Sequence, residues 1–293
     1  MTQSALTPGA VAVVTGGAAG IGLAAAMRFA RMGLKVCLAD SDSDQLVSAA
    51  AQVAGVAPGG EGDVMYQQTD VSSLDQVRHL EQVVLDRFGG TDVLMNNAGI
   101  QPGSAVFGPI ENWRRVLDVN LWGVVHGIQT FVPSMIRRGR RGCVVNTGSK
   151  QGITTPPGDP AYNVSKAGVK ACTEALQHEL RNTPNCSISA HLLIPGFVFT
   201  QLTAQGRTEK PAAAWTPEQT VDFMLDRLAM GISTSCAPTM MCRVRWTSAA
   251  SCGPRAISWK TGRPCLAGIP TTRKTSRSLC AGPSEARALI AFV

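Results

Sequence analysis

Short apolar runs alternate with longer segments of helical periodicity from about Gly9 to Met230, and this alternation constrains the fold more than any other feature. A short apolar run bounded by turn residues is typical of a buried strand, and apolar residues three and four apart indicate a helix. The expected strands are Val11–Thr15, Lys35–Asp40, Val64–Thr69, Asp92–Asn96, Cys143–Asn146 and Ser187–Leu193. The expected helices are Ile21–Met32, Ser43–Ala54, Leu74–Phe88, Trp113–Arg137 and Ala161–Arg181.

Strands separated by helices of this length need crossover connections, which produce a parallel sheet covered on both faces. The predicted fold class is therefore α/β, a doubly wound parallel sheet (Rossmann fold), as one domain over residues 1–231. Ligands of such sheets bind at the carboxyl ends of the strands. No apolar run reaches the ~18 residues of a membrane span, and no secretory signal pattern opens the chain. We expect a cytoplasmic protein with no membrane partner.

The segment Thr15–Gly22, Thr-Gly-Gly-Ala-Ala-Gly-Ile-Gly, joins the first strand to the first helix. Glycines permit a tight turn and a close backbone approach to a pyrophosphate, which the amide groups of the helix N-terminus attract. The turn therefore predicts a dinucleotide site, although an ordinary strand–helix loop is the alternative. The cofactor-binding residues expected here are Gly16, Ala18, Gly20, Ile21 and Gly22.

Two acidic positions follow the next strands. Asp40 ends the second strand, where a carboxylate can bind the adenosine ribose hydroxyls. It would repel a 2′-phosphate, and Ala19 stands where a basic residue could bind one, so NAD is favoured over NADP. Asp70 and Val71, after the third strand, are expected to contact the adenine amino group. The structural alternatives are an acid that begins a polar loop for Asp40 and a helix cap for Asp70.

Tyr162 and Lys166 are four residues apart in a predicted helix and so project from one face. A neighbouring ammonium favours the phenolate, so we expect the pKa of Tyr162 to be lowered. Tyr162 then acts as a base in alcohol oxidation and as an acid in ketone reduction. Ser149, at the end of a strand, can donate a hydrogen bond to the developing alkoxide. The alternatives are a chance pair on a solvated helix and a serine that caps a turn.

As an ordered set, these motifs resemble the compact, single-domain short-chain dehydrogenases/reductases. The matching stretches lie within about residues 9–230 and are Thr15–Gly22, Asn96–Gly99, Asn120, Ser149, Tyr162–Lys166 and Pro195-Gly196. The resemblance implies an NAD-dependent enzyme that interconverts a secondary alcohol and a ketone, with Asn120, Ser149, Tyr162 and Lys166 as the catalytic residues. It implies that Asn120 bends its helix and holds a water in a proton relay from Lys166.

The resemblance also implies further contacts with the cofactor. Asn97, Ala98 and Gly99 would support the central sheet and border the adenosine ribose, and Tyr162 and Lys166 would reach the nicotinamide end. The segment that wraps the nicotinamide would supply Pro195, Gly196, Val198 and Thr200. Gln201 to Thr216 would then form a lid over the substrate.

The substrate is expected to be a small, neutral and fairly apolar alcohol or ketone. Apolar side chains near the expected site are Phe197, Phe199, Trp215 and those of Ile153–Pro157. Arg207 and Lys210 are the basic residues that could reach a charged substrate instead. The nine cysteines form no Cys-x-x-Cys pair and no zinc spacing, so no metal is expected.

The net charge of +7 comes from one end of the chain. Residues 1–231 carry 18 Lys and Arg against 19 Asp and Glu, whereas residues 232–293 carry nine basic residues and one acid, Glu285. Because the basic excess lies outside the predicted domain, nucleic-acid binding is a poor interpretation. Five of the nine cysteines also lie in residues 232–293, where periodicity fails. We expect an atypical, poorly ordered tail.

We interpret this tail as read in a shifted frame, rather than as a disordered basic extension. Met and Trp have single codons, so the frame one nucleotide earlier must contain acidic codons at Met240-Met241, Trp246-Thr247 and Trp259-Lys260. Suitable codons would also turn Ile232–Pro238 into a convincing strand. The chain would then lack its terminal strand, which puts the family-type homo-tetramer or dimer in doubt. Sequencing the encoding DNA tests this hypothesis.

Two other functions remain open. A protein that binds NAD without turnover would result if the tail left its lid or oligomer unformed. A sugar-nucleotide epimerase uses the same Tyr/Lys pair, but its turn spacing differs and it carries a larger substrate domain.

Overall fold

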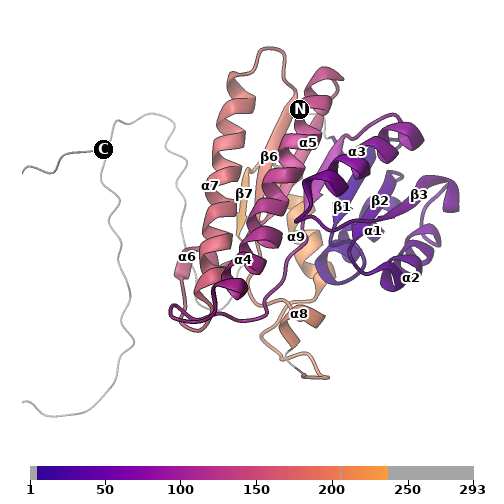
Figure 1. The fold of residues 1–293 in the computed structure, drawn as a ribbon. Coiled ribbons are helices and arrows are strands. Elements are labelled where there is room, and N and C mark those ends of the chain that lie inside the picture. The colour runs from indigo at the N-terminus through magenta and orange to yellow at the C-terminus, as the bar shows by residue number, and fades with distance from the viewer. Residues whose placement is uncertain (1–4, 205, 237–293) are drawn as a thin grey trace, which may run out of the picture. The chain divides into compact units, whose positions relative to one another are not determined.

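The computed structural model describes residues 5–204 and 206–236. Its strands are β1 (Val11–Thr15), β2 (Lys35–Asp40), β3 (Val64–Gln68), β4 (Val93–Asn96), β5 (Gly142–Thr147), β6 (Ile188–Ile194) and β7 (Thr234–Cys236). They form one sheet in the order β3-β2-β1-β4-β5-β6-β7 (Figure 1). Every neighbouring pair is parallel. The predicted doubly wound α/β fold is confirmed, and the strand order reverses between β1 and β4, where such sheets bind ligands.

The helices cover both faces of this sheet. Their bounds are α1 (Gly20–Arg31), α2 (Ser43–Ala54), α3 (Leu74–Phe88), α4 (Ile110–Leu117), α5 (Gly123–Arg137), α6 (Gln151–Thr154), α7 (Pro160–Asn182), α8 (Gln201–Ala204) and α9 (Pro217–Ala229), with short turns η1 (Gly60–Asp63) and η2 (Asp118–Trp122). One core joins α1, α2 and α9 to the sheet. The other core joins α3, α5 and the end of α7 to the opposite face. None of the described helices has the length and apolar character that a membrane crossing requires.

The predicted helix Trp113–Arg137 is interrupted. The chain forms α4, then one π-helical turn, η2, and then α5. Asn120 lies in this turn and is fully buried. A π-helical turn disturbs the regular i→i−4 hydrogen bonds and bends the helix at that point. This π-helical turn lies at the residue where the family resemblance implied a bend.

The sheet continues beyond residue 231, the predicted domain boundary. Thr234–Cys236 pairs in parallel with β6, and the Leu192 amide donates to Ser233 O (2.8 Å) just before this pairing. The expectation that the terminal strand is missing is therefore wrong for these residues, because three residues of backbone pairing suffice to extend a parallel edge. The rest of the predicted tail, including the positions that test the reading frame, lies outside the described residues.

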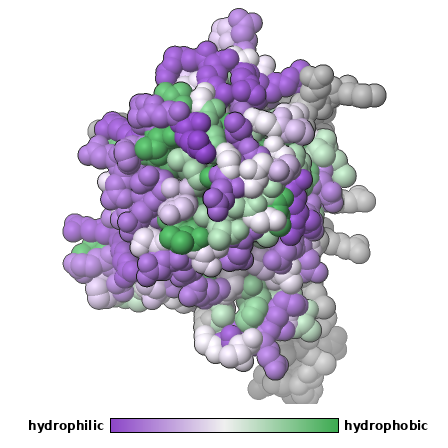
Figure 2. Space-filling model, turned by 90° about the vertical axis from the view of Figure 1, so that its right-hand side faces the viewer, coloured by the Kyte–Doolittle hydropathy of each residue, from purple (hydrophilic) through white to green (hydrophobic). Residues whose placement is uncertain are grey.

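Strand β3 forms the other edge of the sheet. Val64 at its start is buried, the residues from Met65 to Gln68 are partly buried or exposed, and Tyr66 at its centre is 49% exposed. Seen from this side, hydrophilic residues make up most of the surface, with hydrophobic residues interspersed (Figure 2).

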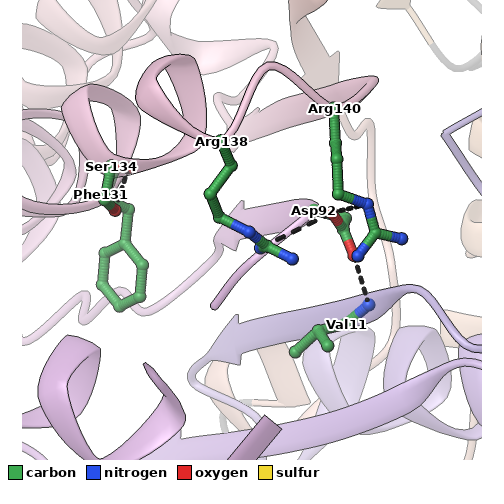
Figure 3. A network of polar contacts seen from close by, with 6 residues as sticks. All are labelled: Val11, Asp92, Phe131, Ser134, Arg138 and Arg140. Atoms are coloured by element: carbon green, nitrogen blue, oxygen red, sulfur yellow. Dashed lines mark hydrogen bonds and ion pairs between the residues drawn. The ribbon is translucent and has the colours of Figure 1, made fainter. Parts of the chain in front are cut away.

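A buried carboxylate connects the amino-terminal ends of the central strands (Figure 3). Asp92, which is 2% exposed, precedes β4 and accepts a hydrogen bond from the Val11 amide through Oδ2 (3.0 Å). Its Oδ1 lies 3.5 Å from Nη1 of Arg138 and 3.5 Å from Nε of Arg140. Asp92 therefore connects β1, β4 and the segment that follows α5. These contacts lie at the amino-terminal ends of the strands, opposite the carboxyl ends where ligands bind.

Candidate active site

A cavity of about 880 Å³ lies at the carboxyl ends of the strands. It contains both groups of residues that the sequence singled out, the glycine turn with its acidic neighbours and the Tyr162 helix. The predicted site residues that line it are Gly16, Gly20, Ile21, Asp40, Asp70, Val71, Asn97, Ala98, Gly99, Ser149, Tyr162, Lys166, Pro195, Gly196, Val198 and Thr200. Ala18, Gly22 and Asn120 do not line it.

The glycine turn between β1 and α1 depends on glycine at defined positions. Gly16 and Gly20 have φ angles of +63° and +54°, a region that L-residues with side chains rarely adopt. A Cβ atom at Gly22 would lie 2.0 Å from Gly16 O, so Gly22 packs beneath the turn rather than facing the cavity. None of the described side chains caps α1 at Ala19, and Ala19, Gly20 and Ile21 all line the cavity. The positive end of the α1 dipole is therefore available to a phosphate.

Asp40 connects the end of β2 to this turn. Its Oδ2 accepts a hydrogen bond from the Ala18 amide (3.1 Å), and its Oδ1 accepts one from the Asp42 amide (3.3 Å). Ala18 is buried and so contributes to the turn through its backbone. The carboxylate is thus oriented by two amides while it lines the cavity.

Asp70 shapes the loop after β3. Its Oδ1 accepts hydrogen bonds from the Ser72 amide (2.9 Å) and hydroxyl (2.7 Å). The residue that caps α3 is Ser73, so the helix-cap alternative for Asp70 is wrong. The neighbouring Val71 carbonyl makes a hydrogen bond with Nδ1 of His126 on α5 (2.9 Å).

Asn97 fastens the end of β4 to the end of β1. Its Nδ2 donates to Thr15 O and to Gly16 O, each at 3.2 Å. Its amide donates to Thr15 Oγ1 (3.0 Å), and its Oδ1 accepts from the Thr147 hydroxyl (3.2 Å). The predicted support of the central sheet by this segment therefore has a direct structural basis in strands β1, β4 and β5.

Helix α7 carries Tyr162 and Lys166 into the cavity. Both are almost fully buried, at 8% and 4% exposed. The Lys166 ammonium donates to Thr147 O at the end of β5 (2.9 Å) and lies 5.7 Å from the centroid of the Tyr162 ring. Ser149, two residues after β5, hydrogen-bonds the Tyr162 side chain. The three predicted catalytic side chains therefore meet where α7 crosses the end of β5.

The expected lowering of the Tyr162 pKa is wrong for the groups of the protein itself. Burial raises the pKa of Tyr162, the hydrogen bond with Ser149 lowers it, and the charge of Asp159 raises it. Burial also lowers the pKa of Lys166 from 10.5 to about 8. Desolvation disfavours the charged form of both residues, which outweighs their proximity on the helix.

Asn120 lies behind the cavity wall. Its Oδ1 accepts from the Ile100 amide (2.8 Å), and its Nδ2 donates to Ile100 O (2.9 Å) and to Ser165 Oγ (3.3 Å). It therefore holds the loop after β4 against α7. A Cβ atom at Gly99 would lie 3.4 Å from Asn120 Oδ1 and 3.6 Å from Lys166 Nζ, so both residues border this glycine. The water relay remains a prediction.

Only some of the residues expected near the substrate line the cavity. Phe197 lines the cavity, but Trp215 packs edge-on against Phe223 of α9, with the ring centroids 5.8 Å apart. Lys210 donates to Ala214 O (2.8 Å) and, like Arg207 and Phe199, does not line the cavity.

Sequence reasoning missed several lining residues. One of them is the last residue of β5, and the others lie in the loops and short helices that follow β3, β4, β5 and β6: Thr69, Ile100, Gln101, Thr147, Lys150, Gln151, Leu202 and Thr203. The available signal was position, because each lies at or after the carboxyl end of a predicted strand, where ligands bind. Lys150 places a cation next to Ser149 that the sequence interpretation had not assigned.

The comparisons with known proteins agree with this geometry. The chain matches the family model described as short chain dehydrogenase over residues 10–211. It is 34% identical to a 3-oxoacyl-acyl-carrier-protein reductase of Thermotoga maritima, over 76% of this chain and 84% of that protein. It is 32% identical to a D-beta-hydroxybutyrate dehydrogenase of Rhizobium meliloti, over 65% of this chain and 72% of that protein.

A solved structure has a similar fold. It is a short chain dehydrogenase/reductase from Burkholderia phymatum in complex with NAD, with a TM-score of 0.72 and 30% identity. The match covers 78% of this chain and 89% of that one.

Proposed function

The chain belongs to the short-chain dehydrogenase/reductase family, and we propose that it is an NAD-dependent oxidoreductase that interconverts a secondary alcohol and a ketone. One observation carries this proposal: the glycine turn with Asp40 and the group Ser149, Tyr162 and Lys166 line the same cavity. A dinucleotide site without an acid/base group would bind but not react. The shared cavity supplies both.

The residues present fit a dinucleotide. The uncapped N-terminus of α1 suits the pyrophosphate, Asp40 suits the adenosine ribose, and the loop after β6 suits the nicotinamide end. When bound, the nicotinamide would accept a hydride from the alcohol carbon or deliver one to the ketone carbon.

The preference for NAD over NADP follows from charge. The Asp40 carboxylate is held by the Ala18 and Asp42 amides, so it cannot easily turn away from a 2′-phosphate. Ala19 places no basic side chain in the turn. The Burkholderia phymatum protein was solved in complex with NAD, which is consistent with this preference.

The protein's own groups handle the proton. In ketone reduction the Tyr162 hydroxyl gives its proton to the substrate oxygen, and in oxidation its phenolate accepts that proton. Ser149 donates a hydrogen bond to the same oxygen, whose negative charge develops in the transition state. Thr147 O fixes the Lys166 ammonium next to Tyr162.

The substrate that we propose is a small, neutral and fairly apolar alcohol or ketone. Phe197 and Leu202 line the substrate end and are partly exposed, which supports an apolar ligand. Lys150 beside Ser149 is the observation that favours a hydroxy acid instead. Neither a nucleic acid nor a membrane is a proposed partner.

A direct screen tests this function. Secondary alcohols, with hydroxy acids as a second panel, are incubated with NAD or NADP at alkaline pH while the absorbance of the reduced cofactor is followed. The expected result is oxidation of at least one neutral alcohol, coupled to reduction of NAD. Turnover with NADP alone would mean that the cofactor is NADP and not NAD. Turnover with hydroxy acids alone would mean that the substrate is a hydroxy acid and not a neutral alcohol. No turnover with any pair, despite binding of NAD, would favour the binding-only alternative.

That alternative has lost part of its basis. It assumed that the altered tail leaves the lid or the oligomer unformed, and the accompanying expectation that the terminal strand is lost does not hold for Thr234–Cys236, which pairs with β6.

A further inference from the structure

A buried carboxylate begins the helix that carries Tyr162. Asp159 is the N-cap of α7 and is 7% exposed. Its Oδ1 accepts hydrogen bonds from the Tyr162 amide (3.4 Å) and from the Ser104 hydroxyl. Ser104 Oγ in turn accepts from the Ala161 amide (2.9 Å). Asp159 and Ser104 therefore fasten the loop after β4 to the first turn of α7.

The negative charge of Asp159 is poorly compensated. Its Oδ2 is buried and has no hydrogen-bond partner among the described residues, nor does any described cation form an ion pair with the carboxylate. Charges interact more strongly in a buried, low-dielectric site than in water. The charge of Asp159 therefore acts on its surroundings, and the nearest ionisable side chain along the helix is Tyr162.

Within residues 5–204 and 206–236, few other groups surround Tyr162. Lys166 lies on the same helix, and Ser149 hydrogen-bonds the phenol. Helix α4 packs against Tyr162 with Trp113 and Val116, neither of which titrates, and α6 contains no ionisable residue. The remaining charged residues that line the cavity in the described part of the chain are Asp40, Asp70 and Lys150. After burial, Asp159 is the group whose charge raises the pKa of Tyr162.

Building on the proposed oxidoreductase activity, we infer that Asp159 is a positioning residue that keeps Tyr162 a neutral phenol and so favours ketone reduction. Two contacts carry this inference, the Asp159 cap on the Tyr162 amide and the Ser104 hydroxyl that holds the carboxylate in place. A neutral phenol is the form that can give its proton to the oxygen of a ketone as hydride adds to the carbon. Alcohol oxidation needs the phenolate, which a neighbouring carboxylate opposes.

The composition of the chain permits a direct test. Tyr66 and Tyr162 are the only two tyrosines, and Tyr66 lies half-exposed on the edge strand β3. In a Tyr66→Phe background, tyrosinate absorbance measured against pH therefore reports Tyr162 alone. Asp159→Asn in this background keeps a side-chain oxygen for the Tyr162 amide but removes the charge. The titration midpoint of Tyr162 is expected to move to lower pH.

A matched control comes from another helix cap. Asp42 caps α2 in the same way, through the Gln45 amide (3.0 Å), and does not line the cavity. Asp42→Asn in the same background should leave the titration midpoint unchanged. Asp159→Ser is a second neutral cap, and circular dichroism checks that both Asp159 variants fold.

The outcomes separate this inference from the proposed function. An unchanged midpoint in the folded Asp159 variants overturns the inference, as does failure of both to fold, because the carboxylate would then serve the fold alone. The titration needs neither cofactor nor turnover. A shifted midpoint in a protein that transfers no hydride would therefore refute the proposed function only. In active enzyme, Asp159→Asn should also move the pH dependence of alcohol oxidation to lower pH.

Discussion

The Lys166 ammonium is hydrogen-bonded to the carbonyl of Thr147, the last residue of β5, at 2.9 Å. This bond ties α7 to the end of β5, and Lys166 is buried, at 4% exposed. One helical turn earlier, the Tyr162 ring lies 5.7 Å from the same ammonium. The sheet therefore places the acid/base pair, and burial keeps both side chains largely out of water.

Tyr162→Phe is expected to reduce hydride transfer by at least roughly a hundredfold, because it removes the hydroxyl that exchanges a proton with the substrate. Cofactor binding should persist, since the glycine turn and Asp40 are unaffected. Steady-state rates and NAD titration by fluorescence measure the two effects. Tyr66→Phe is the matched control and should keep the parental rate. Turnover in Tyr162→Phe close to that of this control would contradict the proposed role.

Lys166→Met is expected to be inactive but more stable than the parent near neutral pH. Burial lowers the pKa of Lys166 from 10.5 to about 8, so the folded parent below pH 8 holds a buried ammonium at a cost in stability. Relief of this cost, less the lost hydrogen bond to Thr147 O, should raise the free energy of unfolding by about 2 kcal/mol.

The stability difference between Lys166→Met and the parent is expected to depend on pH. Between pH 8 and 10.5 the unfolded chain binds more protons at Lys166 than the folded chain, so the parent gains stability as pH rises through this range. The advantage of Lys166→Met should therefore shrink there. Urea unfolding across pH measures it, with Lys170→Met as control, since Lys170 is partly exposed and paired with Glu174. A constant advantage at every pH would contradict the prediction.

Asp40→Asn should shift the cofactor preference toward NADP by about tenfold in kcat/KM, because it removes the charge that repels a 2′-phosphate. The asparagine oxygen can still accept from the Ala18 amide, which preserves the turn. Asp63→Asn is the control, since Asp63 also accepts from an amide, that of Gly59 (2.9 Å), but does not line the cavity. An equal change of preference in both variants would argue against Asp40 as the discriminating residue.

Asp92→Ala should lower the free energy of unfolding by about 3 kcal/mol, because it leaves Arg138 and the buried Val11 amide without their acceptor. Arg140→Ala should cost less than about 1 kcal/mol, since Arg140 is 55% exposed and its ion pair is screened by water. Denaturant unfolding of both variants measures the difference. Equal costs would contradict this prediction, because the exposed ion pair with Arg140 would then account for the whole effect of Asp92.

Local sequence determined much of this protein. The predicted strands and most helices agree with the structure to within one or two residues, because apolar periodicity and side-chain caps act over a few neighbours. The same holds for the glycine turn, where φ and packing restrict the residue type at Gly16 and Gly22. The ordered motifs that identified the family lie on these local elements.

Tertiary structure decided what depends on burial and on contacts between distant segments. It interrupted the helix at Asn120 through contacts with Ile100 and Ser165, and it turned Trp215 away from the cavity toward Phe223. It also reversed the expected direction of the Tyr162 pKa. The spacing of Tyr162 and Lys166 on a helix can be read from sequence, but the loss of solvent around them cannot, because desolvation depends on everything that packs against the pair.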